Sequence, residues 1–122
     1  MPDLVRGRDR LHYEIHAGPA QAAPVLLLHG LGSCAEDWLL QVPPLTQRFA
    51  VVAPDLRGHG SSGGAGWPTM ADHARDASGL LAHLGMQAAH VVGLSLGGAV
   101  ALQLALDAPH AVRSLVLVNT FA

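Results

Sequence analysis

Lysine is absent from this 122-residue sequence, and all seven basic residues are arginine. Charged residues of either sign are scarce at 13%, and the formal net charge is -2 at pH 7. A chain without a basic excess has no electrostatic means of holding polyanions, so we expect neither nucleic acid nor a membrane surface as a partner. Half of the residues are hydrophobic, which favours a fold with much buried backbone, such as a sheet covered on both faces.

Cysteine is nearly absent as well. The single residue Cys34 excludes an intramolecular disulfide and fits a reducing compartment. No apolar run reaches membrane-spanning length, and the charged stretch 1–13 lacks the apolar core of a signal peptide. Histidine is frequent, but its only close pair, His12 and His16, falls on a predicted strand. We therefore expect a soluble cytoplasmic protein without a metal ion or other cofactor.

Short apolar runs alternate along the chain with segments of helical spacing. The first run belongs to a predicted hairpin over 4–18 that turns near residues 7–9. The runs that follow predict buried strands over 25–28, 49–53, 90–92 and 112–118, with helices between them. Strands that alternate with helices are typical of an α/β fold with a mostly parallel sheet flanked by helices.

Polar and glycine residues mark the expected helix ends. Ser33 and Glu36 match a capping-box pattern, which predicts a helix that runs to a stop near residues 43–44. Thr69 is the expected first cap of the next helix, and Gly85 is its expected C-cap.

The segment 93–98, Gly-Leu-Ser-Leu-Gly-Gly, lies between a predicted strand and an apolar helical stretch. The pattern G-x-S-x-G in this setting is typical of a nucleophile elbow, a sharp turn that exposes a serine. Ser95 would adopt a sparsely populated backbone conformation, and Gly93 and Gly97 would remove the side chains that clash there. The Leu96 N–H would point at a negative oxygen formed beside Ser95. The five-residue pattern alone also fits an ordinary turn, but its flanking elements favour the elbow.

Four polar positions follow predicted strands directly: His29 with Gly30, Asp55, Ser95 and Asn119. In open α/β sheets the chemistry gathers at the carboxyl ends of the strands. The sequence therefore predicts that these residues meet at one edge of the sheet.

The sequence resembles the first half of an α/β-hydrolase in the order and spacing of three motifs. These are His-Gly-Leu-Gly at 29–32, Asp-Leu-Arg-Gly-His-Gly-Ser-Ser at 55–62, and the elbow at 93–98. Together with Leu-Val-Asn-Thr at 117–120, the elbow is similar to 3-oxoadipate enol-lactonase-like esterases and lactonases. The resemblance implies the α/β-hydrolase fold, with residues 1–122 as the N-terminal portion of one domain, truncated after its sixth strand.

The same resemblance implies roles for the matching positions. Ser95 would be the nucleophile that attacks the carbonyl of a small ester, lactone or thioester. The backbone N–H groups of Leu31 and Leu96 would form the oxyanion hole, and His29 with Gly30 would shape its loop. The segment 55–62 would be a structural loop at the rim, held by Asp55 and Arg57.

A serine nucleophile needs a base, and in this fold the acid and the histidine follow the serine in the chain. After Ser95 the sequence has only Asp107 and His110, beyond the far end of a helix that spans roughly 18 Å. Neither can reach Ser95 within the ~3 Å of a proton transfer. His29 and His59 are expected to be scaffold residues. We therefore expect half an active site, a longer parent protein, and no triad-dependent turnover by these 122 residues alone.

Other hypotheses remain open. Residues 30–35 fit the loose G-x-G-x-x-G/A pattern, with Asp55 at the end of the next strand, as in a dinucleotide-binding oxidoreductase. A non-catalytic interaction domain is the other alternative, because the apolar run 115–118 would form an open sheet edge suited to self-association. Within the enzyme class, the serine excludes dehalogenases that use aspartate. It leaves esterases, lactonases, carbon–carbon bond hydrolases, haloperoxidases and acyltransferases open.

Overall fold

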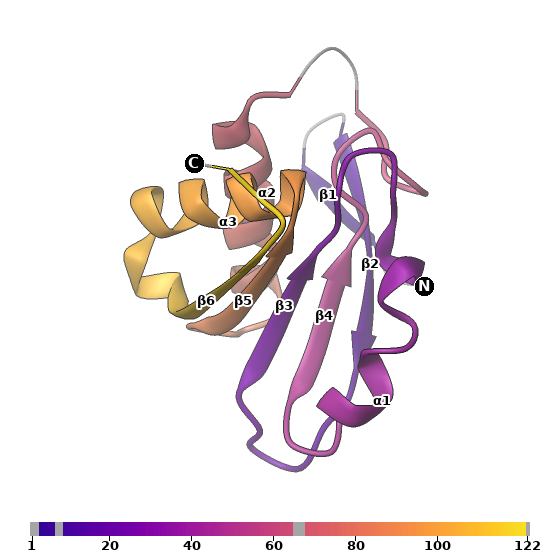
Figure 1. Ribbon diagram of the computed structural model, residues 1–122, viewed down its shortest axis with the longest axis vertical. Helices are drawn as coiled ribbons and strands as arrows, with labels where there is room; N and C mark the ends of the chain where they lie inside the picture. The colour runs from indigo at the N-terminus through magenta and orange to yellow at the C-terminus, as the bar shows by residue number, and fades with distance from the viewer. Residues whose placement is uncertain (1–2, 7–8, 65–67, 122) are drawn as a thin grey trace.

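The six strands pair into one sheet in the order β1-β2-β4-β3-β5-β6 (Figure 1). The computed structural model describes residues 3–6, 9–64 and 68–121. Strands β4, β3, β5 and β6 run parallel, and the β1–β2 hairpin joins them antiparallel through β2 and β4. The predicted mostly parallel α/β sheet is confirmed. The strands span Asp3–Arg6, Asp9–His16, Pro24–Leu28, Ala50–Pro54, Ala89–Leu94 and Val112–Val118.

The predicted hairpin is present, but its burial pattern holds only in part. Leu11 and Tyr13 are buried as expected, whereas Ile15 is 44% exposed. The helix that covers this part of the sheet ends at His83, whose ring packs edge-on against Tyr13. Ile15 is the next inward-facing position along the strand, so it lies beyond the cover of this helix. Of the turn expected near 7–9, residues 7–8 lie outside the described part of the chain.

Helices cover the two faces of the sheet unequally. On one face, α2 (Met70–His83) and α3 (Leu96–Asp107) pack over the strands (Figure 1). On the other face lie the short 3-10 helix η1 (Ala35–Trp38) and the single turn α1 (Val42–Leu45), which contact β3 and β4. A further 3-10 turn, η2 (Pro109–Ala111), precedes β6. The larger hydrophobic core therefore sits under α2 and α3.

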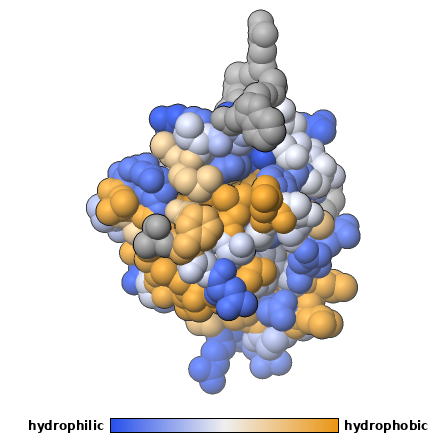
Figure 2. Space-filling model, turned by 45° about the horizontal axis from the view of Figure 1, so that its top comes forward, coloured by the Kyte–Doolittle hydropathy of each residue, from blue (hydrophilic) through white to orange (hydrophobic). Residues whose placement is uncertain are grey.

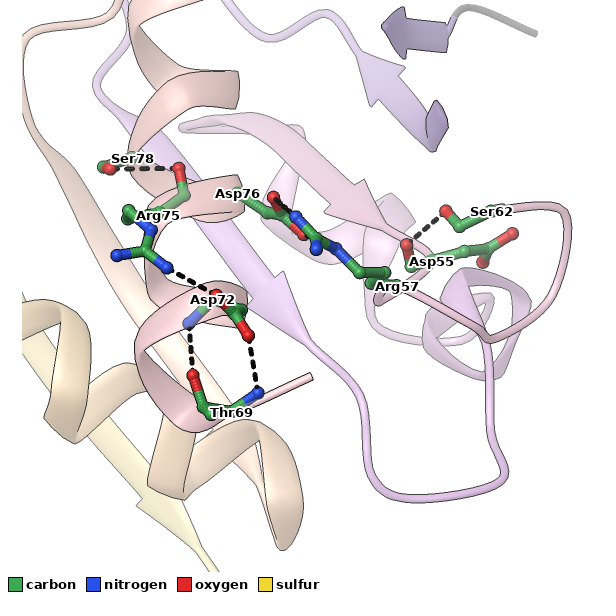
Figure 3. A network of polar contacts seen from close by, with 8 residues as sticks. All are labelled: Asp55, Arg57, Ser62, Thr69, Asp72, Arg75, Asp76 and Ser78. Carbon is green, nitrogen blue, oxygen red and sulfur yellow. Dashed lines mark hydrogen bonds and ion pairs between the residues drawn. The ribbon is translucent and has the colours of Figure 1, made fainter. Parts of the chain in front are cut away.

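The start of α2 forms as the sequence predicts, whereas the expected C-cap Gly85 lies one residue beyond the cap. The Thr69 hydroxyl accepts from the Asp72 N–H at 3.1 Å, and the Asp72 carboxylate accepts from the Thr69 N–H at 2.8 Å (Figure 3). At the other end Leu84 is the cap residue, and Gly85 follows it with φ +71°. The Met86 N–H then bonds the Leu81 carbonyl at 2.9 Å. This pattern needs the left-handed conformation that glycine adopts without strain.

The prediction of a helix that starts at Ser33 is wrong. Ser33 does not act as its cap, because its hydroxyl bonds the carboxylate of Asp37. The cap position is Cys34, which has no side-chain cap bond, and only the four-residue η1 follows. The prolines at 43–44 do not end a helix but lie in the first turn of α1. A first-turn position suits proline, since the N–H it lacks would have no partner there.

Strand β6 is an edge strand that pairs only with β5 among the described strands. Val116, Leu117 and Val118 are 51%, 41% and 38% exposed, although the run is as apolar as a central strand. The open apolar edge expected from the sequence is therefore present.

Replacing Thr69 by alanine should lower the free energy of unfolding by about 1 kcal/mol, because one N–H of the first turn of α2 loses its acceptor. Urea unfolding followed by circular dichroism measures the change. Thr69→Ser keeps the hydroxyl and should stay close to the wild type. Equal loss in both variants would contradict a capping role.

Candidate active site

The carboxyl ends of the parallel strands meet at one edge, as predicted. His29 follows β3, Asp55 follows β4, Ser95 follows β5 and Asn119 follows β6. Figure 2 brings this edge forward and shows apolar side chains in the middle of the face, with polar ones around much of its rim.

Ser95 lies between β5 and α3 with φ 53° and ψ -114°, a strained conformation for a residue with a Cβ. A Cβ on Gly93 would lie 2.4 Å from the Gly97 carbonyl oxygen. A Cβ on Gly97 would lie 2.0 Å from the Leu28 carbonyl oxygen. Both glycines are therefore required by close backbone contacts, and the predicted strand–turn–helix geometry is present.

The backbone of Ser95 is fixed from the end of β6. Its N–H donates to the Val118 carbonyl at 2.9 Å, and its carbonyl accepts from the Thr120 hydroxyl at 2.6 Å. Thr120 has no role predicted from the sequence, where it occurs only within the segment 117–120. No hydrogen-bond partner is found for the Ser95 hydroxyl among the described residues.

The two predicted oxyanion donors flank Ser95. Leu96 is the first residue of α3, where backbone N–H groups have no partner within the helix. Leu31 lies in the turn after β3, and its side chain is 78% exposed. A Cβ on Gly30 would lie 3.5 Å from the Ser95 Cβ, so this turn packs directly against the serine. That the N–H groups of Leu31 and Leu96 form an oxyanion hole stays a prediction.

His29 is fully buried and uses both ring nitrogens. Nδ1 lies 2.7 Å from the Gly30 carbonyl oxygen, which can only accept, so Nδ1 carries the proton. Nε2 then accepts from the Leu56 N–H at 2.9 Å. Burial is the main cause that lowers the pKa of His29 below its ordinary value of 6.5, and the nearby His59 adds to the shift. His29 therefore serves as a neutral link between two loops.

The loop 55–62 is organised by Asp55. Its carboxylate accepts from the Ala35 N–H at 2.7 Å and the Ser61 N–H at 2.8 Å, and its carbonyl accepts from Ser62 Oγ. The expectation for Asp55 is confirmed, and Arg57 holds the loop through a partner outside it. Arg57 makes two hydrogen bonds, at 2.7 and 3.0 Å, with Asp76 of α2 and so ties the loop to that helix (Figure 3).

Two further histidines lie in or beside this loop. The His59 ring packs 5.1 Å from that of His29, and its Nδ1 donates to the Arg57 carbonyl at 3.1 Å. His73 of α2 is 3% exposed, and its Nδ1 has no partner among the described residues. Burial lowers the pKa of His73, the charge of Asp76 opposes that shift, and His59 reinforces it.

The acid and histidine that follow Ser95 in the chain lie where the sequence predicts. Asp107 ends α3 and accepts from Gln103 at 2.9 Å, and His110 is exposed in η2. The 12 residues of α3 separate them from Ser95 by roughly 18 Å. The described residues therefore place no base beside the serine.

The sequence model of a family described as alpha/beta hydrolase fold matches residues 23–122. With this match and the geometry above, the chain belongs to the α/β-hydrolase family.

Relatives within the family differ in what they are named for. The chain is 46% identical over 114 residues to the protein named carbamate hydrolase RutD of Caulobacter vibrioides, covering 91% of this chain and 42% of that protein. It is 43% identical over 111 residues to the dihydrolipoyllysine-residue acetyltransferase component of an acetoin cleaving system of Cupriavidus necator, covering 90% and 29%. The enol-lactonase of Burkholderia xenovorans LB400 superposes with a TM-score of 0.93 at 30% identity, covering 98% and 46%. The chain thus spans less than half the length of each.

The dinucleotide-binding alternative depended on an α-helix that opens directly after the glycines at 30–35. Only the four-residue η1 follows, so the helix N-terminus that would receive a pyrophosphate is missing from this position. In the described part of the chain, no helix has both the length and the hydrophobicity to cross a bilayer. No cluster of three potential metal ligands occurs among those residues either.

Replacing Gly97 by alanine should lower the free energy of unfolding by about 3 kcal/mol or more, because the added methyl group meets the Leu28 carbonyl. Gly85→Ala is the matched control. There the new methyl group has free space, and only the positive φ costs about 1–2 kcal/mol. Thermal unfolding of both variants measures the difference, and equal losses would argue against the close contact at Gly97.

The free energy of unfolding should fall as the pH is lowered from about 8 to about 5.5. His29 and His73 have pKa values below 6.5 in the folded state, so the unfolded chain binds more protons in this range. Above the pKa of the unfolded chain both histidines are neutral in either state and cost the folded state nothing. As the pH falls through that value toward the lower pKa values of the folded state, only the unfolded chain gains protons, and the free energy of unfolding falls.

Urea unfolding at a series of pH values measures this dependence. His73→Leu should reduce the slope, and His110→Gln, at an exposed position, should leave it unchanged. A free energy that stays constant over the range in the wild type would show that the buried histidines do not control it.

Proposed function

We propose that this chain carries the nucleophile and the oxyanion hole of a serine hydrolase, as the N-terminal portion of one α/β-hydrolase domain. The observation that supports this most is the strained Ser95 at the carboxyl edge of the sheet. Its N–H bonds the Val118 carbonyl, and the adjoining turn of α3 packs through Gly97 against the Leu28 carbonyl. A strained conformation persists only where its surroundings impose it, and such residues cluster at active sites.

The chemistry follows from this placement. The Ser95 oxygen attacks the carbonyl carbon of an ester, lactone or thioester, and the electron pair of the C=O bond moves onto its oxygen. The N–H groups of Leu31 and Leu96 stabilise that oxyanion by about 3 kcal/mol each. Collapse of the intermediate expels the alcohol or thiol, and water then releases the acyl group from Ser95.

The serine proton requires a base, and no hydrogen bond joins a histidine of the described residues to the Ser95 hydroxyl. His29 uses both ring nitrogens and His59 donates to the Arg57 carbonyl. We propose that the base and its orienting acid belong to polypeptide outside these 122 residues, and that the 122 residues alone do not turn over. The length of the relatives, which is more than twice the matched span, supports this.

Small acyl compounds are the proposed substrates. The relatives include a protein named as a carbamate hydrolase and an enol-lactonase, which favours carbonyl compounds of this kind. A cytoplasmic location and independence from cofactors belong to the same proposal and rest on the sequence composition.

A second candidate is a non-catalytic interaction domain that binds a partner, or a second copy, through β6. The observation in its favour is the exposed strand, beside a cavity of about 470 Å³ on the η1 face. Trp38, Val92, Leu94 and Val118 line that cavity together with polar residues. A sharp monomer peak in size-exclusion chromatography would count against this candidate, and a defined dimer would favour it.

The 122-residue chain should hydrolyse p-nitrophenyl acetate no faster than its Ser95→Ala variant. Fused after residue 121 to the remaining part of RutD from Caulobacter vibrioides, it should gain hydrolysis that depends on Ser95. Ser78→Ala is the control serine, since Ser78 Oγ only bonds the Arg75 carbonyl on α2. If the Ser95→Ala variant of the fusion still hydrolyses the ester, the proposed function is contradicted.

A further inference from the structure

The hydroxyl of Thr120 lies 2.6 Å from the carbonyl oxygen of Ser95 and donates to it. This contact joins residues 25 positions apart and comes from just beyond the end of β6. Within the first turn of α3 the same carbonyl also accepts from the Gly98 N–H at 2.9 Å and from the Ala99 N–H at 3.3 Å. Thr120 adds a donor from outside the helix, and its bond is the shortest of the three.

The Ser95 carbonyl and the Leu96 N–H belong to one peptide group. The C=O and N–H bonds of a planar trans peptide point in opposite directions. Fixing the direction of the carbonyl therefore fixes the direction of the N–H. A hydrogen bond to the carbonyl also polarises the peptide and strengthens its N–H as a donor.

The side chain of Thr120 is itself held in place. A Cβ on Gly98 would lie 2.3–2.6 Å from the Thr120 side-chain atoms, so the two residues are in tight contact. The second glycine of the Gly97-Gly98 pair is thus required by Thr120, while Gly97 is required by the backbone of β3. Close packing leaves the Thr120 hydroxyl little freedom to turn away from Ser95.

The other predicted donor is fixed in the same way. The Gly30 carbonyl accepts from His29 Nδ1 at 2.7 Å and from the Ser33 N–H at 3.2 Å. That carbonyl shares its peptide group with the Leu31 N–H. Each of the two predicted oxyanion donors therefore has a side-chain hydrogen bond at the opposite end of its peptide.

We propose that Thr120 is a positioning residue that orients and polarises the Leu96 N–H of the oxyanion hole. This rests on the proposed function, since it takes Ser95 as the nucleophile. Thr120 touches no reacting atom and acts only through the Ser95–Leu96 peptide.

The test compares Thr120→Val and Thr120→Ala, which both lack the hydroxyl, with Thr120→Ser, which keeps it. The first measurement is the backbone ¹⁵N chemical shift of Leu96, which reports hydrogen bonding at the preceding carbonyl. We expect an upfield shift in the valine and alanine variants and none in the serine variant. The Leu31 amide should not move in any of them, and it serves as the internal control.

The second measurement uses the RutD fusion described above, which is expected to supply the base. It is the rate at which a fluorophosphonate modifies Ser95, followed by mass spectrometry, because this reaction places a phosphoryl oxygen in the oxyanion hole. Loss of one neutral hydrogen bond should slow it about three- to tenfold in the valine and alanine variants, with the serine variant close to wild type. An unchanged Leu96 shift, an unchanged rate, or a serine variant that behaves like valine would each overturn the role of Thr120.

Failure of the proposed function has a different signature. In that case Ser95 of the wild type reacts no faster than Ser78, while the Leu96 shift still decides whether Thr120 polarises the peptide.

Discussion

The close approach of the first turn of α3 to the ends of β3 and β5 is the contact on which the candidate site depends. Gly97 lies against the Leu28 carbonyl, and Gly93 lies against the backbone of Gly97. Only glycine lets these segments come so close, and the chain must then turn through a positive φ at Ser95. A bulkier residue at either glycine would push α3 away and withdraw both the serine and the helix N-terminus from the edge.

Backbone groups set the electrostatics of this edge more than charged side chains do. The N-terminus of α3 carries a partial positive charge next to Ser95, and the peptides of Leu31 and Leu96 are each held by a neutral side-chain donor. Neutral donors suit this task, because a buried charge would cost far more to desolvate. The lowered pKa of His29 fits this arrangement, since a second ring proton would face the Leu56 N–H and break that link.

Much of this architecture could be predicted from the sequence because it depends on local patterns. The apolar runs gave the strands, Thr69 gave the start of α2, and the glycine pattern gave the turn at Ser95. The prediction failed where a side chain had a choice of partners, since Ser33 bonds the Asp37 carboxylate and caps no helix N–H. The partner of Arg57, Asp76 on a helix 19 positions away, was not predictable from a local pattern either. The role of Thr120 depends on packing between distant segments, which no local pattern encodes.

The spacing of strands in the sheet relates the open edge at β6 to the base that the proposed function requires. Neighbouring strands lie about 4.8 Å apart, so a parallel strand added beside β6 would end two steps, or about 10 Å, from the end of β5. Side chains in the loop after such a strand would approach Ser95 from the side that the described residues leave free. The strand that covers the exposed valines of β6 would thus also carry the groups best placed to take the serine proton. The proposed hydrolase and the interaction candidate would therefore both make use of the open edge at β6.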